Sequence, residues 1–459
     1  MADDFLFWFF WAGSTGLCLL NLLDGWRNPA KMLTWPFLSS LICLYFYGYM
    51  AASAFLQLNY AFKTSDAIIG QLLVLCCLIG INVGWKAGMC SVVDTKPQQN
   101  YSLRKVWVIG ICLMLLATSV HFSFHGFALK SRAGLNFRDN SAYWYMFFWV
   151  GYPGLSMAIW AMCKMNRMER RPLFAISIMV FFAFIFPHVV MARRGPLFPA
   201  VIIFLFIPSI TLRKKPNPVV LTTGLIVAGL AMLTFVQARS FLHNDKGWFD
   251  ALTTINVREV VTTKANQLGD NEYVNHVYFV GTLNKTGKYQ YGTGHLSLLL
   301  HWIPRQVWPS KPSLGQGFFY DGQLFRDLNR HAGYGAFGGG AAAGGFADSF
   351  LQYGYATPLF WLLLGYHFGR RYSAAISNRA PQYLFSYVAI LCSSHWLLSQ
   401  GVAAAFVPCI IFIFVPIVVL RFAQIDLTSS EVEWLEEASD EAGPELQVQQ
   451  SPLSTGDTL

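Results

Sequence analysis

The chain has 459 residues, of which 54% are hydrophobic, 16% aromatic and only 12% charged, and its mean hydropathy is +0.41. A soluble domain carries about one quarter charged residues, so this composition excludes an ordinary soluble protein and predicts a polytopic membrane protein. The formal net charge of +9 indicates cytoplasmic loops that face anionic lipid. No nucleic-acid-binding module is evident, so no nucleic acid is expected among the partners.

A helix that crosses the hydrocarbon core needs about 20 mostly apolar residues. By that criterion the fold is an all-α polytopic membrane protein with about 11 transmembrane helices and one large extracytoplasmic loop. The expected spans are 4 to 23, 34 to 57, 67 to 89, 106 to 124, 142 to 163, 173 to 192, 196 to 212, 218 to 238, 350 to 368, 382 to 400 and 402 to 420. The first span starts without the basic region or cleavage site of a signal peptide, so we expect it to be retained.

Four regions follow from these spans. They are 1–238 with transmembrane helices 1–8, 239–349 as a large periplasmic loop, 350–422 with helices 9–11, and 423–459 as an acidic, disordered cytoplasmic tail. Lys and Arg gather in the odd-numbered connections between spans, which predicts that these connections face the cytoplasm. This topology places the N-terminus and the large loop outside and the C-terminus in the cytoplasm.

Several cations then lie on the outer face, against the orientation bias. They are Arg132, Arg138, Arg193, Arg194, Arg305 and Lys311. Contact with a phospholipid phosphate explains any one of these residues about equally well. The gathering of several on one face is harder to explain in that way. Because Arg binds phosphate oxygens bidentately and stays charged at low dielectric, the pattern indicates a site for a diphosphate at the outer leaflet.

The large loop contains a proline-rich run from His301 to Pro312. Its three prolines exclude a continuous helix, and Trp302 and Trp308 stand beside the cations Arg305 and Lys311, which is typical of a loop at the membrane interface. The tryptophans could stack on sugar faces, although a membrane-interface belt explains them nearly as well.

Histidines and carboxylates supply the remaining candidates. His121 and His125 share a helix face, but no third ligand of the right kind is evident, so structural or substrate-binding histidines are favoured over a metal site. Asp270 and Glu272 are interpreted as solvated turn residues, because the Asp-x-Asp motif of metal-dependent sugar-nucleotide transferases is absent. Asp348, at the mouth of the ninth span, is a candidate base. No metal and no cofactor is expected.

Four pieces of this sequence resemble one family. They are His125-Gly126-Phe127 followed by Arg132, the hairpin Ala192-Arg193-Arg194-Gly195, the run Trp302-Ile303-Pro304-Arg305-Gln306-Val307-Trp308-Pro309-Ser310-Lys311-Pro312-Ser313, and Gly344-Gly345-Phe346-Ala347-Asp348 leading to Tyr353-Gly354. With these pieces the chain resembles the bacterial oligosaccharide repeat-unit polymerases of the Wzy type, the O-antigen polymerases. The family more usually has Glu at the position of Asp348.

The resemblance implies a membrane glycosyltransferase of the bacterial cytoplasmic (inner) membrane. It would transfer a growing glycan from polyprenyl diphosphate onto a newly flipped lipid-linked repeat unit and so build a surface polysaccharide such as O-antigen, capsule or exopolysaccharide. The partners implied are the polyprenyl-diphosphate-linked oligosaccharide, the lipid bilayer, a chain-length regulator and a flippase.

Roles for individual residues follow from that chemistry. Cleavage of a glycosyl diphosphate develops negative charge on the leaving group, which Arg193, Arg194, Arg305 and Lys311 would stabilise. The acceptor hydroxyl needs a base, for which His301, His295 and Asp348 are candidates in that order. The residues expected to bind substrate are Arg132, Arg138, Trp302, Trp308 and His295.

Two other functions remain open at this stage. An O-antigen ligase-like enzyme would use the same donor with a different acceptor. A lipid-linked glycan flippase or exporter would need charged residues through the middle of several spans, and the predicted spans are nearly free of them, which favours an enzyme.

Overall fold

The computed structural model of the protein describes residues 2–91, 100–125, 147–190, 197–213, 217–225, 262, 271–299, 343–377 and 380–424. Within these ranges every named element is a helix, and the single β-bridge joins Tyr101 to Gln424. The elements are α1 Ala2–Arg27, η1 Pro29–Leu33, α2 Trp35–Cys43, η2 Leu44–Tyr49, α3 Met50–Gln57, η3 Asn59–Ala61, α4 Thr64–Met89, α5 Leu103–His125, η4 Phe147–Val150, α7 Gly151–Lys164, α8 Arg167–Val190, α9 Leu197–Thr211, α13 Glu272–Thr286, α14 Thr293–Leu298, α17 Gly345–Tyr353, η5 Gly354–Ala356, α18 Thr357–Ser377, α19 Pro381–Ser399 and α20 Val402–Ala423.

Six of the described helical stretches are long and apolar enough to cross a membrane. They are Asp3–Arg27, Trp35–Gln57, Thr64–Met89, Leu103–Ser123, Arg167–Pro187 and Val402–Ala423. Helix α9 is apolar but shorter. The protein is therefore an all-α membrane protein with several spans, as the composition predicts.

The predicted start of the ninth span is wrong. Residues 345–353 form the separate short helix α17, which ends at Gly354 with a φ of 55°. A 3-10 turn then leads into α18, which extends to Ser377. Apolar composition continues across Gly354, but a left-handed residue cannot continue an α-helix, so hydropathy alone does not detect this break.

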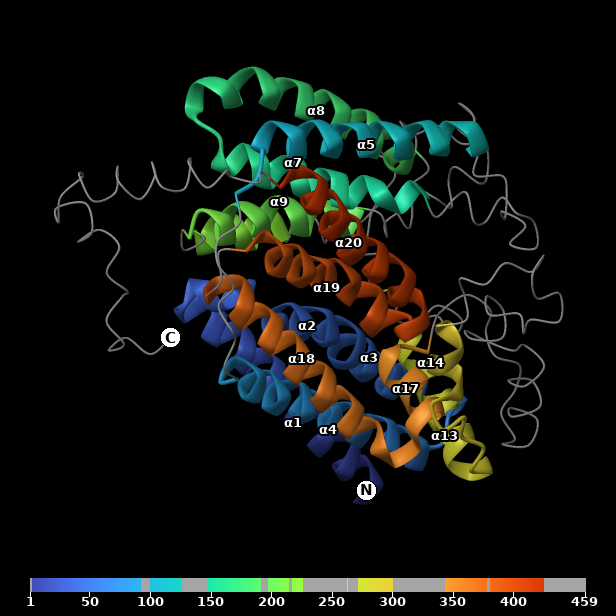
Figure 1. The fold of residues 1–459 in the computed structure, drawn as a ribbon. Helices are drawn as coiled ribbons and strands as arrows, with labels where there is room; N and C mark the ends of the chain where they lie inside the picture. Colours follow the sequence, from blue (N-terminus) through green and yellow to red (C-terminus); the bar gives the residue numbers. More distant parts are fainter. Residues whose placement is uncertain are drawn as a thin grey trace.

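The helices pack in layers (Figure 1). Helices α5 and α8 lie along one side of the bundle and α1 and α4 along the other, with α19 and α20 between them. Helix α18 packs against α4, and α13, α14 and α17 gather at one end of the bundle. We call this end, where α1 also begins, the α13 end.

Backbones approach closely between α4 and α18. Gly80, Gly84 and Gly88 recur at every fourth residue along α4. A Cβ built on Gly84 would lie 2.0 Å from the carbonyl oxygen of Leu362, and one on Gly88 would lie 2.1 Å from that of Tyr366. Small residues let membrane helices pack backbone to backbone, so these three glycines allow α18 to pack directly against α4.

The two ends of the bundle differ in charge. Most described Lys and Arg residues lie opposite the α13 end: Arg27, Lys31, Lys86, Arg104, Lys105, Lys164, Arg167, Arg170, Arg171, Arg213, Arg370, Arg371 and Arg421. Those at the α13 end are Lys63, Lys285 and Lys288. The described part of the chain therefore has one strongly basic end, and the α13 end lies away from it.

Candidate functional site

Two candidate residues, far apart in the sequence, meet at the α13 end. The Nε2 atom of His295 on α14 lies 3.4 Å from Oδ2 of Asp348 on α17. The side chains are 10% and 13% exposed, respectively, so the pair is largely shielded but reachable from the surface. An imidazole beside a carboxylate can bind and move a proton.

Backbone hydrogen bonds hold the turn before α14 against the end of α17. The N–H groups of Gln290 and Gly292 donate to the carbonyl oxygens of Leu351 and Gln352, at 2.8 and 2.9 Å. The buried Gln352 side chain accepts from the N–H of Gly294 at 3.0 Å. Because these bonds hold the chain just before His295, the imidazole is presented to α17 in one position.

A backbone donor from α20 orients Asp348. The N–H of Val402 donates to Asp348 Oδ2 at 2.9 Å. This contact needs the neighbouring Gly401, which has a φ of 121° and whose Cβ, if it had one, would lie 2.6 Å from the same oxygen. The short connection between helices α19 and α20 thus forms part of the site, because only glycine at position 401 leaves room for the carboxylate.

Tyr353 completes this cluster. Its hydroxyl lies 2.9 Å from Nδ1 of His295, so both ring nitrogens of His295 have partners. Burial and, secondly, the Asp348 carboxylate raise the pKa of Tyr353, so its hydroxyl stays protonated at neutral pH. The arrangement that satisfies a neutral imidazole has Nε2–H donating to Asp348 and Nδ1 accepting from Tyr353. The hydrogen bonds from His295 and Val402 both end on Asp348 Oδ2 and not on Oδ1.

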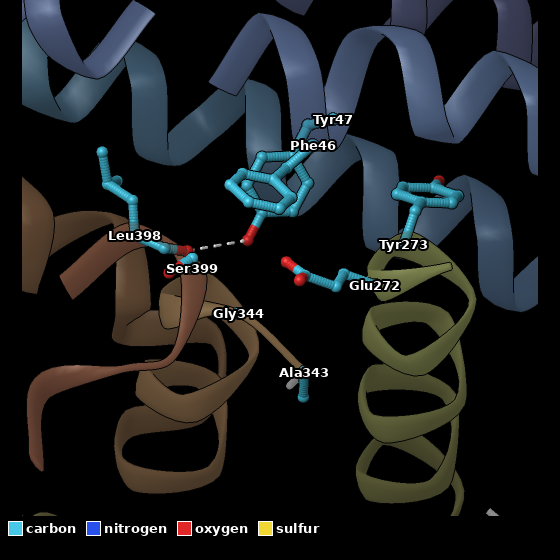
Figure 2. Close-up of a pocket in the computed structure, with 8 residues that line it drawn as sticks. All are labelled: Phe46, Tyr47, Glu272, Tyr273, Ala343, Gly344, Leu398 and Ser399. Atoms are coloured by element: carbon cyan, nitrogen blue, oxygen red, sulfur yellow. Dashed lines mark hydrogen bonds between the residues drawn. The ribbon is translucent and has the colours of Figure 1, made fainter. Parts of the chain in front are cut away.

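A second carboxylate lines a small hollow nearby. Glu272 reaches from the start of α13 toward the Tyr47 hydroxyl, which donates to the carbonyl oxygen of Leu398 at 3.4 Å (Figure 2). The small space between these side chains is also lined by Ser399 and Gly344 and has no room for a water molecule. The interpretation of Glu272 as a solvated turn residue is wrong, because Glu272 is the first residue of α13 and its Oε2 atom is buried. Asp270 lies outside the described residues.

Asn271 is the residue that starts α13 there. Its side chain accepts hydrogen bonds from the N–H groups of Tyr273 and Val274, at 3.0 and 3.2 Å, as an N-cap residue does. Its amide nitrogen donates to the Met50 carbonyl oxygen at 3.2 Å. Asn271 therefore both begins the helix and attaches it to α3.

Most of the predicted site residues lie outside the described ranges. These are Arg132, Arg138, Arg193, Arg194, His301, Trp302, Arg305, Trp308 and Lys311. The structure describes His295 and Asp348 and brings them together. His121 is buried against the Phe148 ring. Among the described residues no cluster of three or more His, Cys, Asp or Glu side chains is suited to a metal ion.

Sequence reasoning assigned no role to Tyr353 or Gly401. Tyr353 stood within the segment that carries the family resemblance, but its partner depends on how α14 folds back onto α17. Gly401 is the single residue between the predicted spans 382 to 400 and 402 to 420. Comparison with known proteins adds no relative, because no family model, curated protein or solved structure matches this chain.

Proposed function

We propose that this protein is a membrane glycosyltransferase that polymerises polyprenyl-diphosphate-linked oligosaccharide repeat units into a surface polysaccharide. The reaction takes place at the outer leaflet of the bacterial cytoplasmic membrane. The proposal includes about 11 spans with one large outer loop, as in the family the sequence resembles. The observation that carries it is the His295–Asp348 pair at the α13 end.

The charge distribution supports an outer location for this site. Lys and Arg next to membrane spans favour the cytoplasmic side. The basic end of the bundle then faces the cytoplasm, and the α13 end, with the pair, faces outward. A lipid-linked repeat unit that has been flipped presents its sugars on that outer side.

The pair suits the acceptor half of a glycosyl transfer. The acceptor hydroxyl oxygen forms a bond to the anomeric carbon of the donor, the bond from that carbon to the diphosphate oxygen breaks, and polyprenyl diphosphate leaves with the electron pair. The hydroxyl proton passes to the Asp348 carboxylate, which His295 and Val402 orient. We therefore rank Asp348 ahead of His295 as the base, since both nitrogens of His295 are engaged.

The leaving diphosphate needs cations. Arg193 and Arg194 stand between α8 and α9, and α9 begins near His395, toward the end of α19. Arg305 and Lys311 follow α14 in the sequence, 10 and 16 residues after His295. We assign these four residues to the stabilisation of the leaving diphosphate, because preorganised cations lower the free energy of charge developing there.

Deletion of the gene in its native host tests the function. Loss of the polysaccharide ladder on a gel, with a single repeat unit still attached to its carrier, supports a polymerase. Complete absence of attached glycan points to a ligase or a flippase, and an unchanged ladder overturns the proposal. In the complemented strain, Arg194→Ala and Arg305→Ala should abolish polymer while the protein still inserts into the membrane. Normal ladders from both variants would refute their assigned roles.

A further inference from the structure

Tyr291 occupies a backbone conformation that a bulky residue rarely adopts. Its φ is 49°, and the ring is 79% exposed. A left-handed conformation costs a non-glycine residue free energy, and glycine or asparagine usually fills such positions. The exposed ring gains little burial that would offset this cost. A large aromatic side chain at this position therefore indicates a function other than stabilising the fold.

The turn that carries Tyr291 is rigidly attached to the candidate site. Gly292 also has a positive φ, of 80°, and the N–H of Thr293 donates to the carbonyl oxygen of Gln290 at 3.0 Å. Two positive φ values at the centre of such a turn match type I′, which favours Asn-Gly rather than Tyr-Gly. A Cβ on Gly292 would lie 3.3 Å from the Tyr353 ring, so the turn abuts the tyrosine that hydrogen-bonds His295.

Aromatic rings form a continuous row from this turn across α17. Tyr291 contacts Tyr289 edge to face at 6.3 Å between ring centroids, and Tyr289 contacts the buried Phe350 at 5.5 Å. Phe350 in turn contacts Tyr355 at 5.6 Å. Tyr355 is 70% exposed, so the row has an exposed tyrosine at each end and a buried ring that fixes its middle.

Amide groups border the row. The Tyr355 hydroxyl donates to Oδ1 of Asn284. The Gln352 amide nitrogen donates to the Gln290 side-chain oxygen at 2.6 Å. Exposed tyrosine faces with neutral amide and hydroxyl groups beside them suit a ligand that has flat C–H faces and many hydroxyls, which is the chemistry of a sugar chain.

We infer that the row Tyr291–Tyr289–Tyr355 is a binding surface for the acceptor glycan, which it leads to the His295–Asp348 pair. The inference rests on the proposed function and extends it by naming the substrate part that this surface holds. Tyrosine provides a large, rigid contact area at a low cost in side-chain entropy, so a few rings can hold a flexible oligosaccharide.

A belt of tyrosines at the membrane interface is the competing explanation. Tyr60 on η3, just before the start of α4, provides a matched comparison. Its ring is 77% exposed, and its φ is not positive. A belt residue needs no left-handed backbone. If Tyr291 only contacts lipid, its replacement should have the same effect as replacement of Tyr60.

Binding to the purified full-length protein in detergent tests the inference directly. The probe is the oligosaccharide mixture released by mild acid from the host's own surface polysaccharide, observed by saturation-transfer NMR. We expect signal transfer to sugar ring protons with the wild-type protein and at least a roughly fivefold weaker affinity for Tyr291→Asn, as for loss of an aromatic anchor. Tyr291→Phe and Tyr60→Asn should bind as the wild type does.

The choice of asparagine separates binding from folding. Asparagine tolerates a positive φ, so Tyr291→Asn should unfold at the same temperature as the wild type or above it. Equal binding by Tyr291→Asn and the wild type, or no binding by the wild type, would overturn the surface. These outcomes are independent of the gene-deletion phenotype: an unchanged ladder on deletion removes the polymerase proposal even if the surface binds glycan.

Discussion

Lys285 on α13 and Asp66 on α4 form an ion pair, with Nζ of the lysine 2.6 Å from Oδ2 of the carboxylate. The Asp66 side chain is only 2% exposed and lies beneath Gly281, where a Cβ would approach Oδ2 to 2.7 Å. The pair therefore holds the last turn of α13 against the start of α4. Because α13 is followed directly by the Tyr291 turn and α14, this ion pair also supports the candidate site.

Removal of the lysine should be costly. Lys285→Met leaves the Asp66 carboxylate buried without its cation, which we expect to lower the free energy of unfolding by roughly 3 kcal/mol. The double variant Asp66→Asn, Lys285→Met should recover most of the loss, because it leaves no unpaired charge. Thermal unfolding of the purified proteins in detergent measures both. Equal stability of the single variant and the wild type would show that the pair contributes nothing.

The α4–α18 contact predicts a contrast between two glycines. Gly84→Ala places a methyl group against the backbone of α18, at 2.0 Å from the Leu362 oxygen, and backbone atoms cannot rotate away. We expect a loss of about 3 kcal/mol or more and a low yield of folded protein. Gly16→Ala in α1 is the control, because its Cβ would meet nothing within 4 Å. Fluorescence-detected gel filtration compares the two, and similar elution profiles would contradict the predicted packing.

Asp348→Asn tests the carboxylate with little change of shape. The amide oxygen can still accept from the Val402 N–H, while the negative charge that takes the acceptor proton is lost. We expect polymer formation to fall on the order of 100-fold or more at unchanged protein level. Asp24→Asn is the matched control: it removes the charge of an exposed carboxylate of α1 that pairs with Lys31, and it should make a normal ladder. A full ladder from Asp348→Asn would exclude this residue as the base.

The buried His276 should make the packing of α13 against α4 sensitive to acid. Burial lowers the pKa of this histidine from 6.5 to about 4, and its Nε2 lies 3.2 Å from the Gly70 carbonyl oxygen. A folded-state pKa below the unfolded value means that the unfolded chain binds the proton more tightly. Stability is then fully present above pH 6.5 and is lost as the pH falls toward 4.

At pH 5 the expected loss from this one group is about 2 kcal/mol. His276→Gln retains an N–H donor for the Gly70 oxygen but does not titrate, so its melting temperature should depend less on pH than that of the wild type. Melting temperatures measured from pH 7.5 to pH 5 give the comparison. Parallel curves for the two proteins would show that His276 is not the group responsible.

Hydropathy located most of the long helices in the described ranges. Long apolar runs such as 67 to 89 and 402 to 420 correspond to α4 and α20, because the transfer of a helix into hydrocarbon depends on the composition of that segment alone. The gathering of basic residues at one end of the bundle is also readable from the sequence, since consecutive spans alternate in direction.

The candidate site was only partly predictable. His295 and Asp348 were identified separately, by residue type and by their position at the outer side, but nothing in the spacing of 53 residues indicates that they touch. The break at Gly354 lies within apolar sequence and was missed, whereas the predicted spans 382 to 400 and 402 to 420 located the break at Gly401. Nothing in the sequence indicates that Gly401 packs against the Asp348 carboxylate, because that contact depends on how α17 and α20 meet.

The sequence by itself thus determined that the chain is a helical membrane protein with one basic end, because those properties depend on local composition. Only the tertiary structure decided that His295, Asp348 and Tyr353 form one hydrogen-bonded cluster, and that Glu272 lines a hollow instead of facing solvent. These contacts join segments from α13, α14, α17 and α20, whose relative positions depend on how the whole bundle packs.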